Sequence, residues 1–174
     1  EKYPNAESFD EYLAEEDDWE VFYQLSDLRT GLISWYDFQP GANVLEVGAG
    51  FGALTGKLCG KCTHVTATER SLYRAQGMAK RYATVDNLTI YAGDISQIPL
   101  REKYDYIVVV GLLERMGDHQ KQYLQQLKGL LTAKGRLLLA VTNRFGLKYF
   151  CGARDPYTRK AFGGINQYDR YTKG

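Results

Sequence analysis

The chain has 174 residues, of which 44% are hydrophobic and 25% charged, the composition of an ordinary globular domain with one sizeable core. A net charge of +1 gives no general attraction to nucleic acid or to anionic lipid, so we expect neither as a partner. No stretch approaches the roughly 18 apolar residues of a membrane span, and the acidic N-terminus lacks the apolar core of a signal peptide. The sequence therefore predicts a cytoplasmic protein without a membrane span.

The three cysteines are too few for a disulfide framework. Cys59, Cys62 and His64 resemble half of a zinc site, but structural zinc sites usually offer two tight pairs of ligands. The sequence predicts thiols in a reducing compartment and no metal site.

The first 40 residues predict an N-terminal helical cap. Apolar residues recur at helical spacing between Trp19 and Trp35, which indicates a helix or a helix pair packed on the domain. The dipeptide Pro40-Gly41 ends this segment.

Residues 41–142 alternate between strand and helix patterns. Strands are expected at 44–47, 63–68, 88–91, 106–110 and 136–141, and helices after the first strand and at 71–82 and 118–131. This alternation implies right-handed crossovers and predicts an α/β fold with a doubly wound, mainly parallel sheet. Residues 143–174 are rich in aromatic residues and glycine and show no strand period. We expect this extension either to be a loosely ordered structural cover or to form a lid or a wall of the acceptor site. In the second case Arg144, Tyr149 and Tyr157 could line a sugar site.

A glycine-rich loop follows the first strand, in the run VLEVGAGFGALT at residues 44–55. Glycines remove the side chains that would keep a nucleotide-like ligand off the backbone. The pattern also fits G-x-G-x-x-[GA], so a dinucleotide-binding oxidoreductase is an alternative. Glu46 favours another ligand, because a carboxylate two residues before Gly48 repels a phosphate and suits the ammonium and sulfonium groups of S-adenosylmethionine.

Acidic residues also follow the second and third expected strands, at the edge of the sheet where ligands bind in open α/β folds. Glu69 is placed to accept the ribose hydroxyls, and Asp94 with Ile95 to meet the adenine. Each has a structural alternative: Glu69 as a surface acid that caps the following helix, and Asp94 as a turn residue. After the fourth strand come Gly111 and Leu112.

With the segments TATERS, YAGDI and YDYIVVVGLLERM, this loop resembles the class I S-adenosylmethionine-dependent methyltransferases over about residues 40–142. The resemblance implies a Rossmann-like, seven-stranded sheet with the cofactor over the first strands. It also implies a set of cofactor-binding residues: Glu46, Gly48, Ala49, Gly50 and Gly52 for the methionine part, Glu69 for the ribose, Asp94 and Ile95 for the adenine, and Gly111 and Leu112 for the methyl-donor side. The C-terminal strand hairpin of that fold is not evident in the sequence, so we expect a truncated domain of a longer protein.

Two flanking segments, FYQLSDLRTGLISWYDF and NRFGLKYFCGARDPYTRKAFGGINQY, resemble a bacterial methyltransferase group found beside or fused to glycosyltransferases of surface polysaccharide synthesis. That resemblance implies O-methylation of a sugar, glycan or other small molecule, and a fused or neighbouring glycosyltransferase as partner. The segment GALT also resembles the rRNA adenine dimethyltransferases. Those carry an Asn-Leu-Pro-Tyr-like motif after the fourth strand, where this chain has GLLE at 111–114, so RNA methylation is not favoured.

An alcohol acceptor needs a base to remove its proton. The candidates are Glu114, His119 and Asp155, and Glu114 has a solvated surface acid as its alternative. The rival interpretation is a non-catalytic module that binds the cofactor, or keeps only its fold, within a larger protein.

Overall fold

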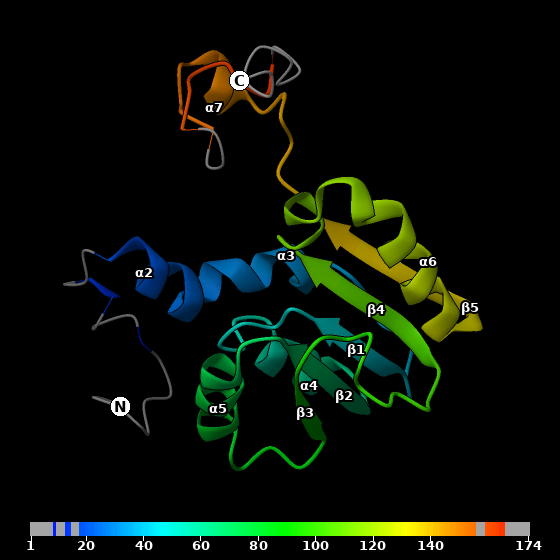
Figure 1. Ribbon diagram of the computed structural model, residues 1–174. Helices are drawn as coiled ribbons and strands as arrows, with labels where there is room; N and C mark the ends of the chain where they lie inside the picture. Colours follow the sequence, from blue (N-terminus) through cyan, green and yellow to red (C-terminus); the bar gives the residue numbers. More distant parts are fainter. Residues whose placement is uncertain (1–8, 10–12, 15–17, 156–158, 166–174) are drawn as a thin grey trace. The chain divides into compact units, whose positions relative to one another are not determined.

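The computed structural model describes residues 9, 13–14, 18–155 and 159–165; Tyr157 therefore lies outside the described residues. The chain divides into two compact units, Glu1–Ala140 and Val141–Gly174. In the first unit a twisted sheet is flanked by helices (Figure 1). None of the described helices is long and apolar enough to cross a membrane.

Five parallel strands form the sheet, in the order β3-β2-β1-β4-β5. Their bounds are β1 Asn43–Val47, β2 His64–Glu69, β3 Leu88–Ala92, β4 Tyr104–Val110 and β5 Leu131–Ala140. The order reverses at the junction of β1 and β4, which is the position where doubly wound sheets open a crevice. The predicted fold class and all five strands are confirmed.

Helices cover both faces of the sheet because side chains alternate along the strands. Val44 and Val108 lie in one core cluster with Leu58 of α4, Thr55–Lys61. Leu45 and the residues that share its face pack on Leu127 of α6, Gln120–Leu130. The helix α5, Leu72–Arg81, contacts β2 and β3 on the α4 side, where its Met78 packs on the strand core.

Between residues 19 and 34 the N-terminal cap forms three short pieces rather than the predicted helix or helix pair: α2 Trp19–Leu25, η1 Asp27–Thr30 and α3 Gly31–Ser34. The break is at Ser26, whose backbone is extended (φ −69°, ψ 132°) and whose hydroxyl accepts the N–H of Leu28 at 3.3 Å. A serine cap inside a helical apolar pattern starts a new turn, which periodicity alone does not reveal. From α3, Ile33 is buried in the same core cluster as Val44.

The strand β5 begins five residues earlier than predicted. Its register against β4 jumps from Tyr104–Leu131 to Tyr106–Arg136, so the residues between Leu131 and Arg136 form an irregularity within the strand pair. A Cβ at Gly135 would lie 2.8 Å from the Tyr104 carbonyl oxygen, so this close backbone approach requires glycine.

After β4 come two short turns, η2 Leu113–Arg115 and η3 Gly117–His119. The described part of the second unit contains the short helix α7, Leu147–Phe150, and one isolated antiparallel bridge between Arg154 and Ala161.

Candidate functional site

A cavity of about 350 Å³ lies at the carboxyl ends of the strands, on both sides of the β1–β4 junction. Its volume is within the range of small-molecule sites. Nine of the ten predicted cofactor-binding residues line it: Glu46, Gly48, Ala49, Gly50, Glu69, Asp94, Ile95, Gly111 and Leu112.

The glycine loop uses its N–H groups within the protein. The N–H groups of Gly48 and Ala49 both donate to the Thr68 carbonyl, at 2.9 and 3.1 Å, and that of Gly52 donates to the Ala49 carbonyl at 3.0 Å. The Gly50 N–H donates to the Glu69 carboxylate at 3.0 Å. A pyrophosphate needs such donors, so this arrangement disfavours a dinucleotide and favours a ligand without phosphate.

Glu69 is held at the end of β2 by two backbone donors. Its Oε2 accepts the Gly50 N–H, and its Oε1 accepts the N–H of Ser71, the N-cap of α5, at 2.8 Å. Only 7% of the residue is exposed, so the surface acid considered as an alternative is wrong, although the carboxylate does contact the helix start. Two charge-assisted bonds fix this carboxylate at the cavity wall.

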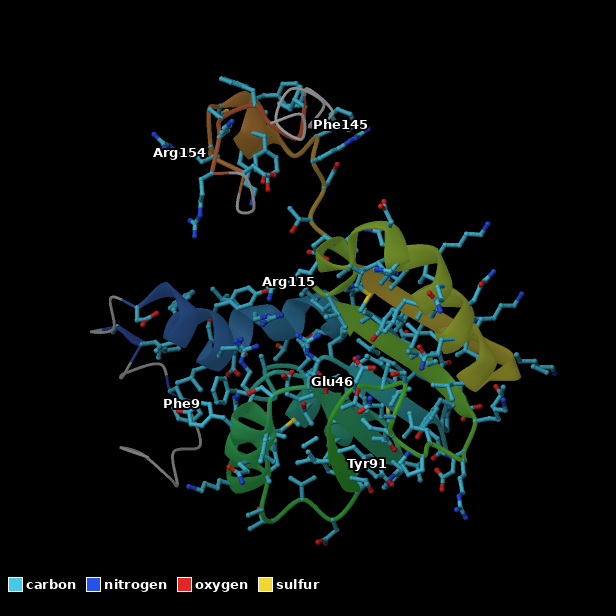
Figure 2. All side chains as sticks on the ribbon, viewed as in Figure 1. Phe9, Glu46, Tyr91, Arg115, Phe145 and Arg154 are labelled. Atoms are coloured by element: carbon cyan, nitrogen blue, oxygen red, sulfur yellow. The ribbon has the colours of Figure 1, made fainter. Side chains whose placement is uncertain are left out.

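Glu46 is buried at 4% exposure and lies near the centre of the first unit (Figure 2). Its Oε2 accepts a short bond, 2.6 Å, from the Thr55 hydroxyl at the start of α4. Desolvation raises the pKa of Glu46 to about 7, although the Thr55 bond and the charge of Arg29 both lower it. The carboxyl group therefore changes its charge close to neutral pH.

The loop after β3 places one exposed and one buried residue at the cavity. Asp94 Oδ1 accepts the N–H and the hydroxyl of Ser96, at 2.9 and 2.6 Å, and these bonds lower the Asp94 pKa. The turn role considered as an alternative is thus present, together with a place in the cavity wall. Ile95 is buried against the Leu45 face of the sheet.

Gly52 is the predicted cofactor-binding residue that the structure leaves outside the lining. A Cβ there would lie 2.6 Å from Tyr82 Cε2, and its φ of +84° is rarely adopted by other residues. The Tyr82 hydroxyl donates to the Gly52 carbonyl at 2.6 Å. Gly52 thus allows α5 to pack on the loop, a role that the sequence spacing did not separate from ligand contact.

The loop after β4 closes the opposite side of the cavity. The N–H of Gly111 donates to the Ala140 carbonyl at 2.9 Å, which ties this turn to β5. A Cβ at Gly48 would lie 3.1 Å from Leu112 Cδ2, so the two loops meet at the β1–β4 junction.

Neither of the predicted bases in the first unit, Glu114 and His119, lines the cavity. Glu114 lies in η2, partly buried, between the lining residues Leu112 and Arg115. His119 is exposed at the end of η3, directly before α6. Asp155 is buried, at 4% exposure, within the second unit, whereas the cavity belongs to the first.

Several lining residues were missed by the sequence analysis: Tyr23, Gln24, Arg29, Arg70, Arg74, Arg115, Met116 and Tyr123. The first three come from the N-terminal cap, whose polar positions within FYQLSDLR were the only available signal. Arg115 lies beyond the end of β4 (Figure 2).

Among proteins with assigned functions, ribosomal RNA small subunit methyltransferase A of Acinetobacter baylyi is 37% identical over 68 residues, which is 39% of this chain and 23% of that protein. Phosphoethanolamine N-methyltransferase 1 of Haemonchus contortus, solved with phosphoethanolamine and S-adenosylhomocysteine, superposes with a TM-score of 0.62 at 20% identity, over 75% of this chain and 30% of that one. A coclaurine N-methyltransferase bound to N-methylheliamine and S-adenosylhomocysteine gives 0.54 at 26% identity, over 72% and 38%.

The chain thus spans less than half the length of each of these three proteins. The sequence profile of a family described as a methyltransferase domain matches residues 45–137, which is more than half of the chain and contains the loop, β2, β3 and β4. This chain therefore belongs to the methyltransferase domain family.

Proposed function

We propose that this domain binds S-adenosylmethionine in the cavity of the first unit and transfers its methyl group to an oxygen of a sugar, a glycan or another small molecule. The family and the solved relatives that hold S-adenosylhomocysteine confirm the predicted cofactor. The observation that carries the proposal is the glycine loop: the N–H groups of Gly48, Ala49, Gly50 and Gly52 are bonded within the protein, and carboxylates stand at the ends of β1 and β2.

The residues around the cavity fit this cofactor. S-adenosylmethionine has a neutral adenosine and a methionine end with positive ammonium and sulfonium groups and a carboxylate. The cavity presents Glu46 and Glu69 to positive and hydroxyl groups. It also contains a buried acceptor, Gln24 Oε1, that has no hydrogen-bond partner among the described residues and lies 3.3 Å from where a Cβ at Gly50 would be. A buried polar atom without a partner at a cavity wall is suited to a ligand.

We assign the roles by position. Glu69 accepts the ribose hydroxyls, because its two backbone bonds fix both oxygens and leave lone pairs for further donors. Ile95 supports the adenine face and Asp94 its amino group. Glu46 stabilises the ammonium, and Gly111 with Leu112 flanks the methyl donor.

The bound cofactor would supply an electrophilic methyl group on a positively charged sulfur. The residues of this chain hold it so that the acceptor atom approaches in line, and alignment provides much of the rate. For an alcohol acceptor we propose Glu114 as the base, since its neighbours Leu112 and Arg115 line the cavity and it is the partly buried candidate of the first unit.

Support for an oxygen acceptor, and for a fused or neighbouring glycosyltransferase as partner, comes from the resemblance of the segments before β1 and after β5. An amine acceptor is the second candidate, because two of the similar solved proteins are N-methyltransferases by name. The rival function is a cofactor-binding module without activity.

Titration calorimetry with S-adenosylmethionine, NAD and the variant Glu69→Ala tests the cofactor site. We expect binding of S-adenosylmethionine, no binding of NAD, and a loss of affinity of about 30-fold or more in the variant. Release of S-adenosylhomocysteine with a panel of sugars and amines then tests the acceptor. Binding without turnover on any acceptor would support the non-catalytic module.

A further inference from the structure

The N-terminal cap contributes a positively charged side chain, Arg29, to the cavity. Arg29 of η1 lines the cavity, and its Nε is buried with no hydrogen-bond partner among the described residues. Burial lowers the Arg29 pKa, and this desolvation outweighs the interactions with Tyr23 and Glu46, which raise it. The Nε–H group therefore loses hydration without gaining a hydrogen-bond acceptor from the described residues, which is costly unless a ligand supplies one.

The arginine is held in place by its own segment. Its guanidinium carbon lies 3.7 Å from the centre of the Tyr23 ring, a stacking contact that fixes the plane of the donor group. The Ser26 cap starts η1 and therefore sets where Arg29 leaves the backbone. The donor group is thus oriented before any ligand binds.

The N-terminal cap is also connected to the glycine loop by hydrogen bonds from a shared arginine. Arg81 of α5 donates from Nη1 to the carbonyls of Gln24 and Phe51, at 3.2 and 3.4 Å. Gln24 Oε1 lies 3.3 Å from where a Cβ at Gly50 would be, so the Gln24 side chain faces that glycine. The cap and the loop that receives the methionine end of the cofactor are therefore parts of one wall.

We propose that Arg29 binds the carboxylate of the methionine end of S-adenosylmethionine, an inference that rests on the proposed function. The carboxylate is the one anionic group of this cofactor, and the acids Glu46, Glu69 and Asp94 that line the same cavity would repel it. A planar guanidinium with several N–H donors matches a carboxylate geometrically. Arg29 is close enough to Glu46 for the two charges to interact, and Gln24 of the same cap faces Gly50. Arg70 and Arg74, in contrast, follow β2, on the ribose side.

The test compares two ligands that differ only in this group: S-adenosylmethionine and its decarboxylated form, which keeps the ammonium and the sulfonium. Calorimetry on the unmodified chain is expected to show about 30-fold tighter binding of the carboxylated ligand. The variant Arg29→Met is expected to lose that preference, with little change in affinity for the decarboxylated ligand. The variant Arg29→Lys keeps the positive charge but loses the planar set of N–H donors, and it is expected to retain part of the preference for the carboxylated ligand.

The matched control is Arg115→Met, which removes one positive charge from an exposed arginine of the same cavity. We expect this variant to keep the preference. Equal affinity of the unmodified chain for both ligands, an unchanged preference in Arg29→Met, or the same loss in both methionine variants would overturn the assignment. If neither ligand bound the unmodified chain, the proposed function itself would be wrong.

Discussion

The ends of β1 and β2 each present a glutamate to the same cavity, yet the two side chains are held by different contacts. Glu69 at the end of β2 accepts two backbone N–H groups, and both are fixed donors. Glu46 in β1 has a hydroxyl bond from Thr55 and is buried deeply enough that its pKa rises to about 7. Identical residues one strand apart therefore differ in their contacts: two backbone donors reach Glu69, whereas burial dominates at Glu46 and raises its pKa.

The largest expected effect concerns the cost of ionising Glu46. Its pKa is about 7 in the folded chain and 4.5 ordinarily, so the folded state holds the proton more tightly and stability falls as the pH rises from about 4.5 to 7. Glu46→Gln removes this cost. Its free energy of unfolding, relative to the unmodified chain, is expected to grow by about 2 to 3 kcal/mol between pH 5 and pH 8, measured by urea denaturation without cofactor. A pH-independent difference would contradict the raised pKa.

The same substitution at Glu69 is expected to act in the opposite direction. Glu69→Gln offers one acceptor oxygen to two N–H groups, so one buried donor faces an amide nitrogen. We expect a loss of about 2 kcal/mol in stability and weaker binding of S-adenosylmethionine. Denaturation at pH 7 checks the first and calorimetry the second. A stabilised Glu69→Gln would remove the contrast between the two strand ends.

The affinity for the cofactor is also expected to depend on pH through the ionisation of Glu46. If the ammonium of the cofactor requires an ionised Glu46, binding must first remove a proton below pH 7. Affinity is therefore expected to rise about tenfold between pH 5.5 and 7, or roughly 1.4 kcal/mol, and to be nearly constant in Glu46→Gln. Calorimetry in two buffers of different ionisation enthalpy would detect the released proton.

The smallest effect is expected at the end of β3. Asp94 is exposed and already bonded to Ser96, and these bonds keep its pKa low, so it stays ionised at neutral pH. Asp94→Asn keeps an oxygen for the turn, and we expect less than about 1 kcal/mol of change in cofactor binding. A loss of cofactor affinity as large as that in Glu69→Gln would show that the exposure of an acidic residue at this sheet edge does not predict its contribution to binding.

Much of the fold was determined by local patterns in the sequence. The strand and helix alternation predicted the five strands and the parallel sheet. The glycine loop, the residues at the strand ends and the family resemblance predicted nine residues of the cavity wall. These predictions succeeded because parallel strands bring their carboxyl ends to one edge, whatever the details of packing. Glycine spacing and Glu46 together also favoured S-adenosylmethionine, and two similar solved structures hold S-adenosylhomocysteine.

Other features were decided only by tertiary structure. The N-terminal cap brings Gln24 and Arg29 to the cavity, and no local pattern specifies which face of a short helical cap meets a site built from loops later in the chain. Gly52 contacts Tyr82 rather than the cavity, because α5 packs there. The charge of Glu46 likewise depends on burial and on Thr55, which are set by the packing of α4 on β1. The sequence therefore determined the order of the strands and helices and the class of cofactor, whereas tertiary packing determined which side chains face the cavity and can bind that cofactor.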